Sequence, residues 1–482
     1  MNDAQLKSEL TLFDATNLVV GSIIGADIYV ASAFGAGLLG PFSLVVWLAA
    51  GVMAIVIALC FAQCAALLPK VGGPYAYAHD AWGPLPGFVV GWSLWLAEWM
   101  SLAAFPLAFT QYLMFFLPGL TVPLQIAVKA GFVLFLIVTN VIGVKTAGRT
   151  NDVLTIVKLG PLIFFIVIGV IFAVLNPVAV AGNLTPFLPF GPGNFGTALV
   201  LIFWAYAGFE IGTIPAGEIR DPAKTIPRAI VIGIAIVAVF YLTTNMILFA
   251  VMPSSQLAAS TAPLATATSS ILAPLSLIAI GGTAIVGVGA LISVAGSDES
   301  GMIGTSRLGY ALAVDGLFPR VFAKIHPRFK TPYVGIIIQA GTALVAAIIG
   351  NLSTIIGTSV FFMAIAYVAT SISIFTLRKK YQAKFRLRGG SVVPILGAVF
   401  SIYLITQCNL IQIGLGLLLL TVGMPIYFEY TPKKEIAELR QAFFSRENIL
   451  RRIERREHLF LADLLHHAGK FFRRRKRPSQ QS

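Results

Sequence analysis

Long apolar stretches, separated by short polar or charged segments, fill the chain as far as residue 430. Most of them run for about 20 residues or more, which is the length that an α-helix needs to cross the hydrocarbon core of a bilayer. This pattern predicts an all-α polytopic membrane protein with about twelve transmembrane helices. The expected spans are 12–38, 41–68, 85–117, 121–143, 152–175, 196–217, 227–251, 271–297, 333–350, 353–377, 391–408 and 410–429.

The loops between the expected spans fall into two sets that alternate along the chain. The loops of one set carry almost no charge, and they are 39–40, 118–120, 176–195, 252–270, 351–352 and 409. The loops of the other set carry the cations, among them Lys70, Lys145, Arg149, Arg220, Lys224, Arg228, Arg307, Arg320, Lys324, Arg328, Lys330 and the run from Arg378 to Arg388. Because basic loops stay in the cytoplasm, the alternation predicts a multi-pass protein of the plasma membrane with both termini cytoplasmic.

Composition supports this prediction and accounts for the net charge. Of the 482 residues, 57% are hydrophobic and 11% are charged, whereas a soluble domain has about 25% charged residues. The formal net charge of +14 comes from the basic loops and a basic tail at 431–482, so it requires no nucleic-acid partner. The tail places Phe, Ile and Leu among its arginines, which suits an amphipathic helix on anionic membrane lipid. A solvated tail that only enforces the topology is the alternative.

Little in the sequence indicates an enzyme or a metal centre. Cys60 and Cys64 share a helix face, but they have no His or carboxylate neighbours to complete a metal site. The His79–Asp80 pair lies in an expected cytoplasmic loop, and its surroundings lack the lysine of a phosphate-binding loop and the serine of a nucleophile elbow. We therefore expect no catalytic residue, no metal and no cofactor, and we do not expect an enzyme.

Two spans are interrupted by glycine near their middle, with an acid just beyond the break. They read GSIIGADIYV, with Asp27, and FWAYAGFEIGTIP, with Glu210, and they stand five spans apart. Paired breaks of this kind predict a five-plus-five inverted repeat with helices 1 and 6 broken. Repeat one would cover about 12–175 and repeat two about 196–377, with two further helices at 391–429, giving a helical domain at 1–430. The alternative is two continuous helices whose glycines allow close packing.

A break inside a membrane span has a direct physical consequence. It leaves backbone N–H and C=O groups without partners, which is tolerable only where they line a cavity and bind something. Half-helix N-termini attract anions, and exposed carbonyls attract cations. A substrate with a carboxylate and an ammonium on one carbon fits such a pair of helix ends.

Four stretches resemble the amino acid–polyamine–organocation (APC) transporter superfamily, which has the leucine-transporter (LeuT) fold. They are GSIIGADIY, ALCFAQCAALLPKVGGPYAYAHDAWGPLPGFVVGW, FWAYAGFEIGTIPAGEIRDPAKTIPRAI and TSRLGYALAVDGLFPRVFAKIHPRFKTP. The resemblance extends to about Tyr430. It implies an amino acid permease that works by alternating access, in which helices 1, 2, 6 and 7 rock against the rest. A polyamine or cationic amino acid carrier or exchanger, and a transporter-like nutrient sensor, remain alternatives.

The resemblance also implies a substrate site at the two breaks. Backbone N–H groups of helix 1 would hold the substrate carboxylate, carbonyls of helices 1 and 6 would hold the ammonium, and Trp204 or Phe209 would cover the substrate. Ala207 would leave room for a side chain, and Glu210 would relay a proton or orient the broken helix. The implied substrate-binding residues are Ile23, Gly25, Ala26, Asp27, Trp204, Ala207, Phe209 and Glu210.

Lys158 lies in the expected fifth helix, in the segment LTIVKLGPL. It matches a lysine that, in many family members without sodium coupling, takes the place of a sodium ion between helices 1 and 8. The resemblance therefore implies bonds to carbonyls around Gly21 and Ser22, with Ser293 or Ser297 as possible partners. Because burial favours the neutral amine, Lys158 would carry the coupling proton. A lysine that snorkels to the cytoplasmic surface, or one that stays charged with uniport or exchange, is the alternative.

The other intramembrane acids have open roles. Asp27 stands where the family usually has glycine, and it would bind a cationic substrate group, carry the coupling proton, or bond the broken helix itself. Glu98 would face the cavity or form an intramembrane ion pair. Asp298 and Glu299 follow the expected end of helix 8, where we expect a solvated cytoplasmic pair.

Overall fold

A computed structural model describes residues 10–142, 147–214, 216, 219–382 and 389–431. The chain divides into two compact units, 1–427 and 428–482, and the first of them contains nearly all of the described helices. The predictions for the basic tail and for Lys145 lie outside the described residues.

Every named element among the described residues is helical. The helices are α1 (Leu12–Ile23), α2 (Ala26–Leu39), α3 (Ser43–Leu67), α4 (Pro74–Trp82), α5 (Pro84–Phe116), α6 (Val122–Ile142), α7 (Ala147–Leu175), α8 (Pro177–Asn183), α9 (Phe195–Phe203), α10 (Pro222–Val251), α11 (Ser254–Ala259), α12 (Pro263–Leu272), α13 (Ser276–Val314), α14 (Tyr333–Ile349), α15 (Leu352–Lys380), α16 (Val392–Gln407) and α17 (Leu410–Tyr430). Short 3₁₀ turns cover Gly40–Phe42, Trp204–Tyr206, Ile211–Thr213 and Arg320–Ala323.

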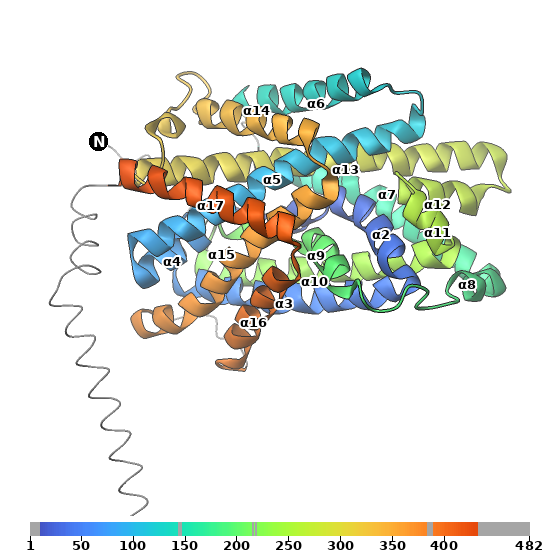
Figure 1. The fold of residues 1–482 in the computed structure, drawn as a ribbon, viewed down its shortest axis with the longest axis horizontal. Helices are drawn as coiled ribbons and strands as arrows, with labels where there is room; N and C mark the ends of the chain where they lie inside the picture. Colours follow the sequence, from blue (N-terminus) through green and yellow to red (C-terminus); the bar gives the residue numbers. More distant parts are fainter. Residues whose placement is uncertain (1–9, 143–146, 215, 217–218, 383–388, 432–482) are drawn as a thin grey trace, which may run out of the picture. The chain divides into compact units, whose positions relative to one another are not determined.

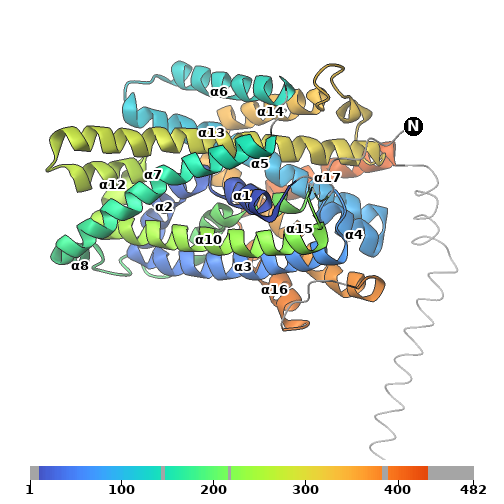
Figure 2. The same ribbon diagram turned by 180° about the vertical axis from the view of Figure 1, so that it is seen from behind.

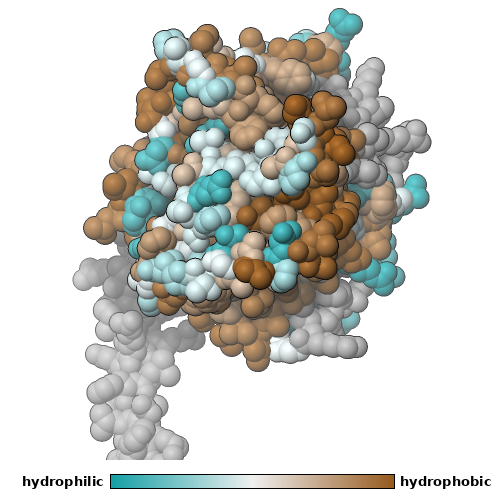
Figure 3. Space-filling model, turned by 90° about the vertical axis from the view of Figure 1, so that its right-hand side faces the viewer, coloured by the Kyte–Doolittle hydropathy of each residue, from teal (hydrophilic) through white to brown (hydrophobic). Residues whose placement is uncertain are grey.

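The helices have the length and composition of membrane spans. In the described part of the chain, nine apolar helical segments are long enough to cross a bilayer, and three apolar helices, α1, α14 and α16, are shorter. Each predicted span overlaps one or two of these segments, and the first covers α1 together with α2. The all-helical architecture confirms the prediction of an all-α polytopic membrane protein. In Figure 3, which looks onto one end of the molecule, hydrophilic residues gather in the middle and hydrophobic residues lie around them.

Some spans are central and others face outward. In the most apolar 18-residue stretch of α5, 89% is buried, whereas in that of α6 only 17% is buried. Helices α6 and α14 pack on each other and lie at the edge of the bundle in both ribbon views (Figures 1 and 2). The core that α5 occupies is therefore where intramembrane polar groups are removed from both water and lipid.

Loops that the charge pattern placed on the same side contact one another. The Thr331 hydroxyl donates at 2.7 Å to the carbonyl of Val141, at the end of α6, and Lys380 forms an ion pair with Asp80 at 3.4 Å. Both contacts lie at helix ends next to loops of the basic set. On the uncharged side, the side-chain amide Nδ2 of Asn183 donates to the Ala250 backbone carbonyl at 2.9 Å. Each of these three contacts joins segments that the charge pattern places on one side.

The prediction that Asp298 and Glu299 form a solvated pair beyond helix 8 is wrong. Helix α13 is 39 residues long and ends at Val314, which is about 58 Å at a rise of 1.5 Å per residue. Both acids therefore lie well inside the helix. Asp298 is 1% exposed, and Glu299 is half-buried. The polar segment AGSDESG is typical of a helix end, but its residues remain helical within α13, which packs against α5, α7 and α14.

Candidate functional site

The first helix is broken between α1 and α2. The N–H of Ile24 closes α1 by donating to the Val20 carbonyl at 2.9 Å, and Gly25 precedes the first turn of α2 without a side-chain cap. A Cβ on Gly25 would lie 2.7 Å from the Cβ of Ser297 on α13. Glycine therefore lets the break contact α13, and the uncapped N–H groups of the first α2 turn are available to an anion.

The sixth span is broken between α9 and the turn Ile211–Thr213. Gly208 has φ of +115°, a conformation that only glycine adopts at little cost. A Cβ at this position would meet the carbonyl oxygen of Ser22 at 2.8 Å. The two breaks therefore touch each other through Ser22 and Gly208.

A small cavity of about 30 Å³ lies where the breaks meet. This volume holds one or two water molecules, so the surrounding helices must move apart to admit a larger ligand. Asp27 and Glu98 both line the cavity, and they are 4% and 7% exposed. The full lining is Ser22, Asp27, Glu98, Ser101, Phe105, Trp204, Ala207, Gly208, Ile211, Ser297, Gly301 and Met363.

Three of the predicted substrate residues line the cavity, namely Asp27, Trp204 and Ala207. Gly25 and Ala26 are next to Asp27 at the start of α2 but do not themselves line it. Asp27 occupies the first turn of α2, where a carboxylate interacts favourably with the helix dipole. This position leaves all three interpretations of Asp27 open.

The remaining predicted substrate residues point elsewhere. The Ile23 carbonyl accepts a hydrogen bond from the Tyr241 hydroxyl at 3.0 Å. Phe209 is fully buried against Phe61, with ring centroids 5.3 Å apart. Glu210 is also fully buried, and its Oε2 accepts a hydrogen bond from the Gly208 N–H at 3.0 Å. Of the two roles considered for Glu210, this contact corresponds to orienting the broken helix.

Two cavity residues on α5 were not predicted from the sequence. Ser101 Oγ accepts a hydrogen bond from Trp204 Nε1 at 3.1 Å, and the Phe105 ring lies 5.9 Å from the Trp204 ring between centroids. The spacing from Glu98 to Ser101 and Phe105 is three and then four residues, which places all three on one helix face. This spacing is the sequence feature that could have indicated Ser101 and Phe105 as cavity residues.

Lys158 on α7 turns inward and is 2% exposed. Its ammonium donates to the Gly21 carbonyl at 2.7 Å, the Ile24 carbonyl at 3.3 Å and the Ser297 hydroxyl at 3.1 Å. This geometry excludes the surface-snorkelling alternative. The lysine uses Ile24 where Ser22 was expected, because the Ser22 carbonyl lies against Gly208 instead.

The two predicted serines of helix 8 complete this cluster. The Ser297 hydroxyl lies 2.8 Å from the Ile24 carbonyl, and Ser293 Oγ lies 3.5 Å from the same oxygen. Among the described carboxylates, Asp27 and Glu299 interact electrostatically with the Lys158 ammonium. A single cation thus links the broken first helix to α7 and α13.

A family model described as "Amino acid permease" matches residues 10–424. The chain belongs to the amino acid permease family. This permease is 29% identical to the branched-chain amino acid permease BcaP of Bacillus subtilis (strain 168), over 89% of this chain and 94% of that protein. It is 28% identical to the serine/threonine exchanger SteT of the same organism, over 90% of this chain and 99% of that protein.

A further relative is named for a substrate that is not an amino acid. The permease is 29% identical to the methylthioribose transporter of Bacillus subtilis (strain 168), over 90% of this chain and 96% of that protein. Family membership therefore confirms a multi-pass membrane transporter and not an enzyme, but similarity at this level does not select a substrate.

The His79–Asp80 pair has a structural role on the basic side of the permease. Tyr381 donates from its hydroxyl to Asp80 Oδ2 at 2.9 Å, and Lys380 also donates to the Asp80 backbone carbonyl. The Asp80 carboxylate raises the pKa of Tyr381 by this hydrogen bond. These contacts hold the end of α15 to α4, away from the cavity.

Proposed function

We propose that the permease moves amino acids across the plasma membrane by alternating access, with both termini in the cytoplasm, and that it couples this movement to protons through Lys158. The observation that carries the proposal is the position of the Lys158 ammonium, within 3.3 Å of two free backbone carbonyls and of the Ser297 hydroxyl. The break leaves those carbonyls without backbone partners, and the ammonium adds a charged donor to the hydroxyl donors of Ser293 and Ser297.

The protonation state of Lys158 sets the strength of this link. An ammonium has three N–H donors, and three acceptors surround it. A neutral amine keeps two donors and loses the charge, and a charge-assisted hydrogen bond is roughly twice as strong as a neutral one. Loss of the proton therefore releases α1 from α7 and α13, and the half-helix becomes free to swing open.

The substrate occupies the adjacent cavity once the surrounding helices have moved apart. Its carboxylate binds the N–H groups at Gly25, Ala26 and Asp27, at the positive end of α2. Its ammonium binds carbonyls near Trp204 and Ala207, and the Trp204 indole covers it. Trp204 is better placed for this role than Phe209, because only Trp204 lines the cavity.

A second candidate is a carrier of cationic amino acids or polyamines. Asp27 and Glu98 both line the cavity, and two buried carboxylates suit a substrate that carries an additional positive group. Uptake of arginine, putrescine and alanine by Asp27→Asn and Glu98→Gln separates the candidates. Selective loss of arginine and putrescine uptake supports a cationic substrate, whereas equal loss of all three supports proton coupling.

The proposed coupling is tested with Lys158→Met, which keeps the side-chain stem and removes the charge. The matched control is Lys129→Met on α6, because Lys129 is also a buried lysine that donates to one backbone carbonyl, that of Ala347 at 3.0 Å. In proteoliposomes, uptake by the control should still rise with an inward proton gradient, and uptake by Lys158→Met should not. Equal stimulation of both variants would contradict the proposal.

A further inference from the structure

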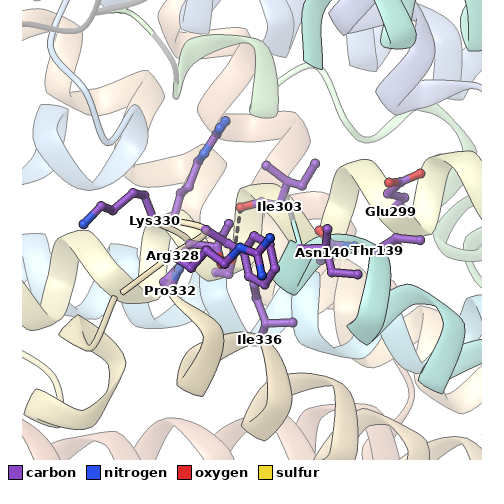
Figure 4. A pocket seen from close by; sticks show the side chains of 13 residues that line it. Thr139, Asn140, Glu299, Ile303, Arg328, Lys330, Pro332 and Ile336 are labelled. Atoms are coloured by element: carbon purple, nitrogen blue, oxygen red, sulfur yellow. Dashed lines mark hydrogen bonds between the residues drawn. The ribbon is translucent and has the colours of Figure 1, made fainter. Parts of the chain in front are cut away.

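A second and larger cavity, of about 530 Å³, opens between α6, α13, α14 and the segment that joins α13 to α14. It lies away from the two breaks and shares no lining residue with the small cavity. In Figure 4, Arg328 lies in the middle of the lining residues, Glu299 and Asn140 lie on one side of it, and Lys330 lies on the other. The proposed transport cycle assigns no role to this cavity.

Three cations line one part of the cavity: Arg307, Arg328 and Lys330. Neither of the two ion pairs found among the described residues involves them. The segment that presents two of them is held by His326, whose Nδ1 accepts from the N–H groups of Arg328 and Phe329 at 3.2 Å each. The backbone that carries Arg328 and Lys330 is therefore held in a defined conformation, and the three exposed cations form no ion pair with a described carboxylate.

The backbone at Lys330 supports the same conclusion. Lys330 has φ of +59°, which is uncommon for a residue other than glycine. Its N–H donates to the His326 carbonyl at 3.0 Å. Such strain persists only when the surrounding structure imposes it, so the backbone of this turn is held in a defined conformation.

The opposite part of the cavity offers hydrogen-bond acceptors. Asn140 is 5% exposed, and its Nδ2 donates to the Leu136 carbonyl at 2.9 Å. Its Oδ1 finds no hydrogen-bond donor in the described part of the chain. A buried amide oxygen without a donor is unfavourable, so this atom favours a ligand with an N–H or O–H group. The Glu299 carboxylate lies on the same side in Figure 4.

We propose that this cavity binds the headgroup of a membrane phospholipid that carries hydrogen-bond donors beyond its phosphate, such as phosphatidylethanolamine or phosphatidylglycerol. The phosphate lies against Arg328 and its two cationic neighbours, because guanidinium and phosphate form bidentate hydrogen bonds. The ammonium or hydroxyl end of the headgroup donates to Asn140 Oδ1 and Glu299. Phosphatidylcholine lacks such donors, so it leaves the amide oxygen without a partner.

The surroundings favour a lipid over a free phosphate compound. Helix α6 exposes Phe135, Val138 and Ile142, and α14 exposes Ile337 and Ile338, so apolar surface for acyl chains lies next to the cavity. The cavity also belongs to the basic side of the molecule, where clefts between membrane helices recruit anionic headgroups.

The test is native mass spectrometry of the full-length protein with phosphatidylcholine, phosphatidylethanolamine or phosphatidylglycerol of identical acyl chains. Wild type should retain the latter two more than phosphatidylcholine. Arg328→Gln should retain all three about fivefold less, from about 1 kcal/mol for each cation near a headgroup. Asn140→Leu should weaken the preference over phosphatidylcholine, because only Glu299 remains as an acceptor, while still retaining lipid. The matched control is Arg320→Gln, an equal change of charge in the same segment at an exposed residue outside the cavity.

Several outcomes would overturn the proposal. Retention that is equal for the three lipids in wild type, or equal in Arg328→Gln and Arg320→Gln, excludes a headgroup site here. Glycerol 3-phosphate is tested in the same way as a soluble phosphate compound. If the protein binds it but retains no lipid, the cavity binds a free phosphate compound. If Arg328→Gln does not purify folded, Lys330→Asn replaces it, because asparagine tolerates the positive φ.

Discussion

Replacement of Gly208 by alanine perturbs the contact between the two helix breaks with a single methyl group. The new Cβ would lie 2.8 Å from the Ser22 carbonyl oxygen and 2.9 Å from its carbon. Both are backbone atoms, which cannot rotate aside as a flexible side chain would. The residue would also keep φ near +115°, which is unfavourable for any residue with a Cβ.

The magnitude comes from these two costs. Strained backbone contributes about 1–3 kcal/mol, and overpacking contributes about 1–3 kcal/mol more. At the lower end of about 2 kcal/mol, the population in which the two breaks touch falls about thirtyfold. We therefore expect Gly208→Ala to lose at least tenfold in transport rate and to unfold at a lower temperature than wild type.

The assay is uptake into proteoliposomes together with thermal unfolding in detergent. Gly83→Ala is the matched control, because Gly83 also has positive φ, +97°, but no atom lies within 4 Å of its added Cβ. This control measures the conformational cost without the clash. If Gly208→Ala transports as well as Gly83→Ala, the breaks do not need to touch and the reasoning is refuted.

Three further substitutions probe the site. Ser297→Ala removes one of the three acceptors around the Lys158 ammonium. One hydrogen bond contributes about 1 kcal/mol, so the stimulation of uptake by a proton gradient should fall about fivefold. Unchanged stimulation would exclude Ser297 from the coupling. Trp204→Phe keeps a ring but loses the bond to Ser101, so KM should rise several-fold with little change in Tm, and an unchanged KM would contradict the role of Trp204 as the cover. Glu210→Gln keeps an acceptor for the backbone N–H two residues earlier, so transport should persist if Glu210 orients the helix, whereas abolished transport at unchanged Tm would indicate a proton relay.

Hydrophobic pattern and loop charge were sufficient to predict the fold class. The helical spans coincide with the predicted ones because each apolar run must satisfy its own backbone in lipid, whatever its neighbours are. The end of α13 was the exception. Local polarity around Asp298 indicated a loop, but packing against other helices keeps that segment helical, and such long-range contacts leave no local signal.

The site residues next to the helix breaks were predictable from the sequence, whereas those placed by packing between helices were not. Glycine positions indicated both breaks, and the lysine in the fifth span indicated the cation beside them. The sequence could not show that the Ser22 carbonyl contacts Gly208 while the Ile24 carbonyl accepts from Lys158, because both contacts depend on how distant helices pack. Nor could it show that Ser101 supports Trp204, since that contact joins residues 103 positions apart.

The most direct measurement of the central claim follows amino acid flux and internal pH in the same proteoliposomes. Wild-type protein should acidify the interior in proportion to substrate uptake when no proton gradient is imposed. Lys158→Met should take up substrate, if at all, without acidification, while Lys129→Met should acidify as wild type does. Substrate-dependent acidification that persists in Lys158→Met would show that the coupling proton travels through another group.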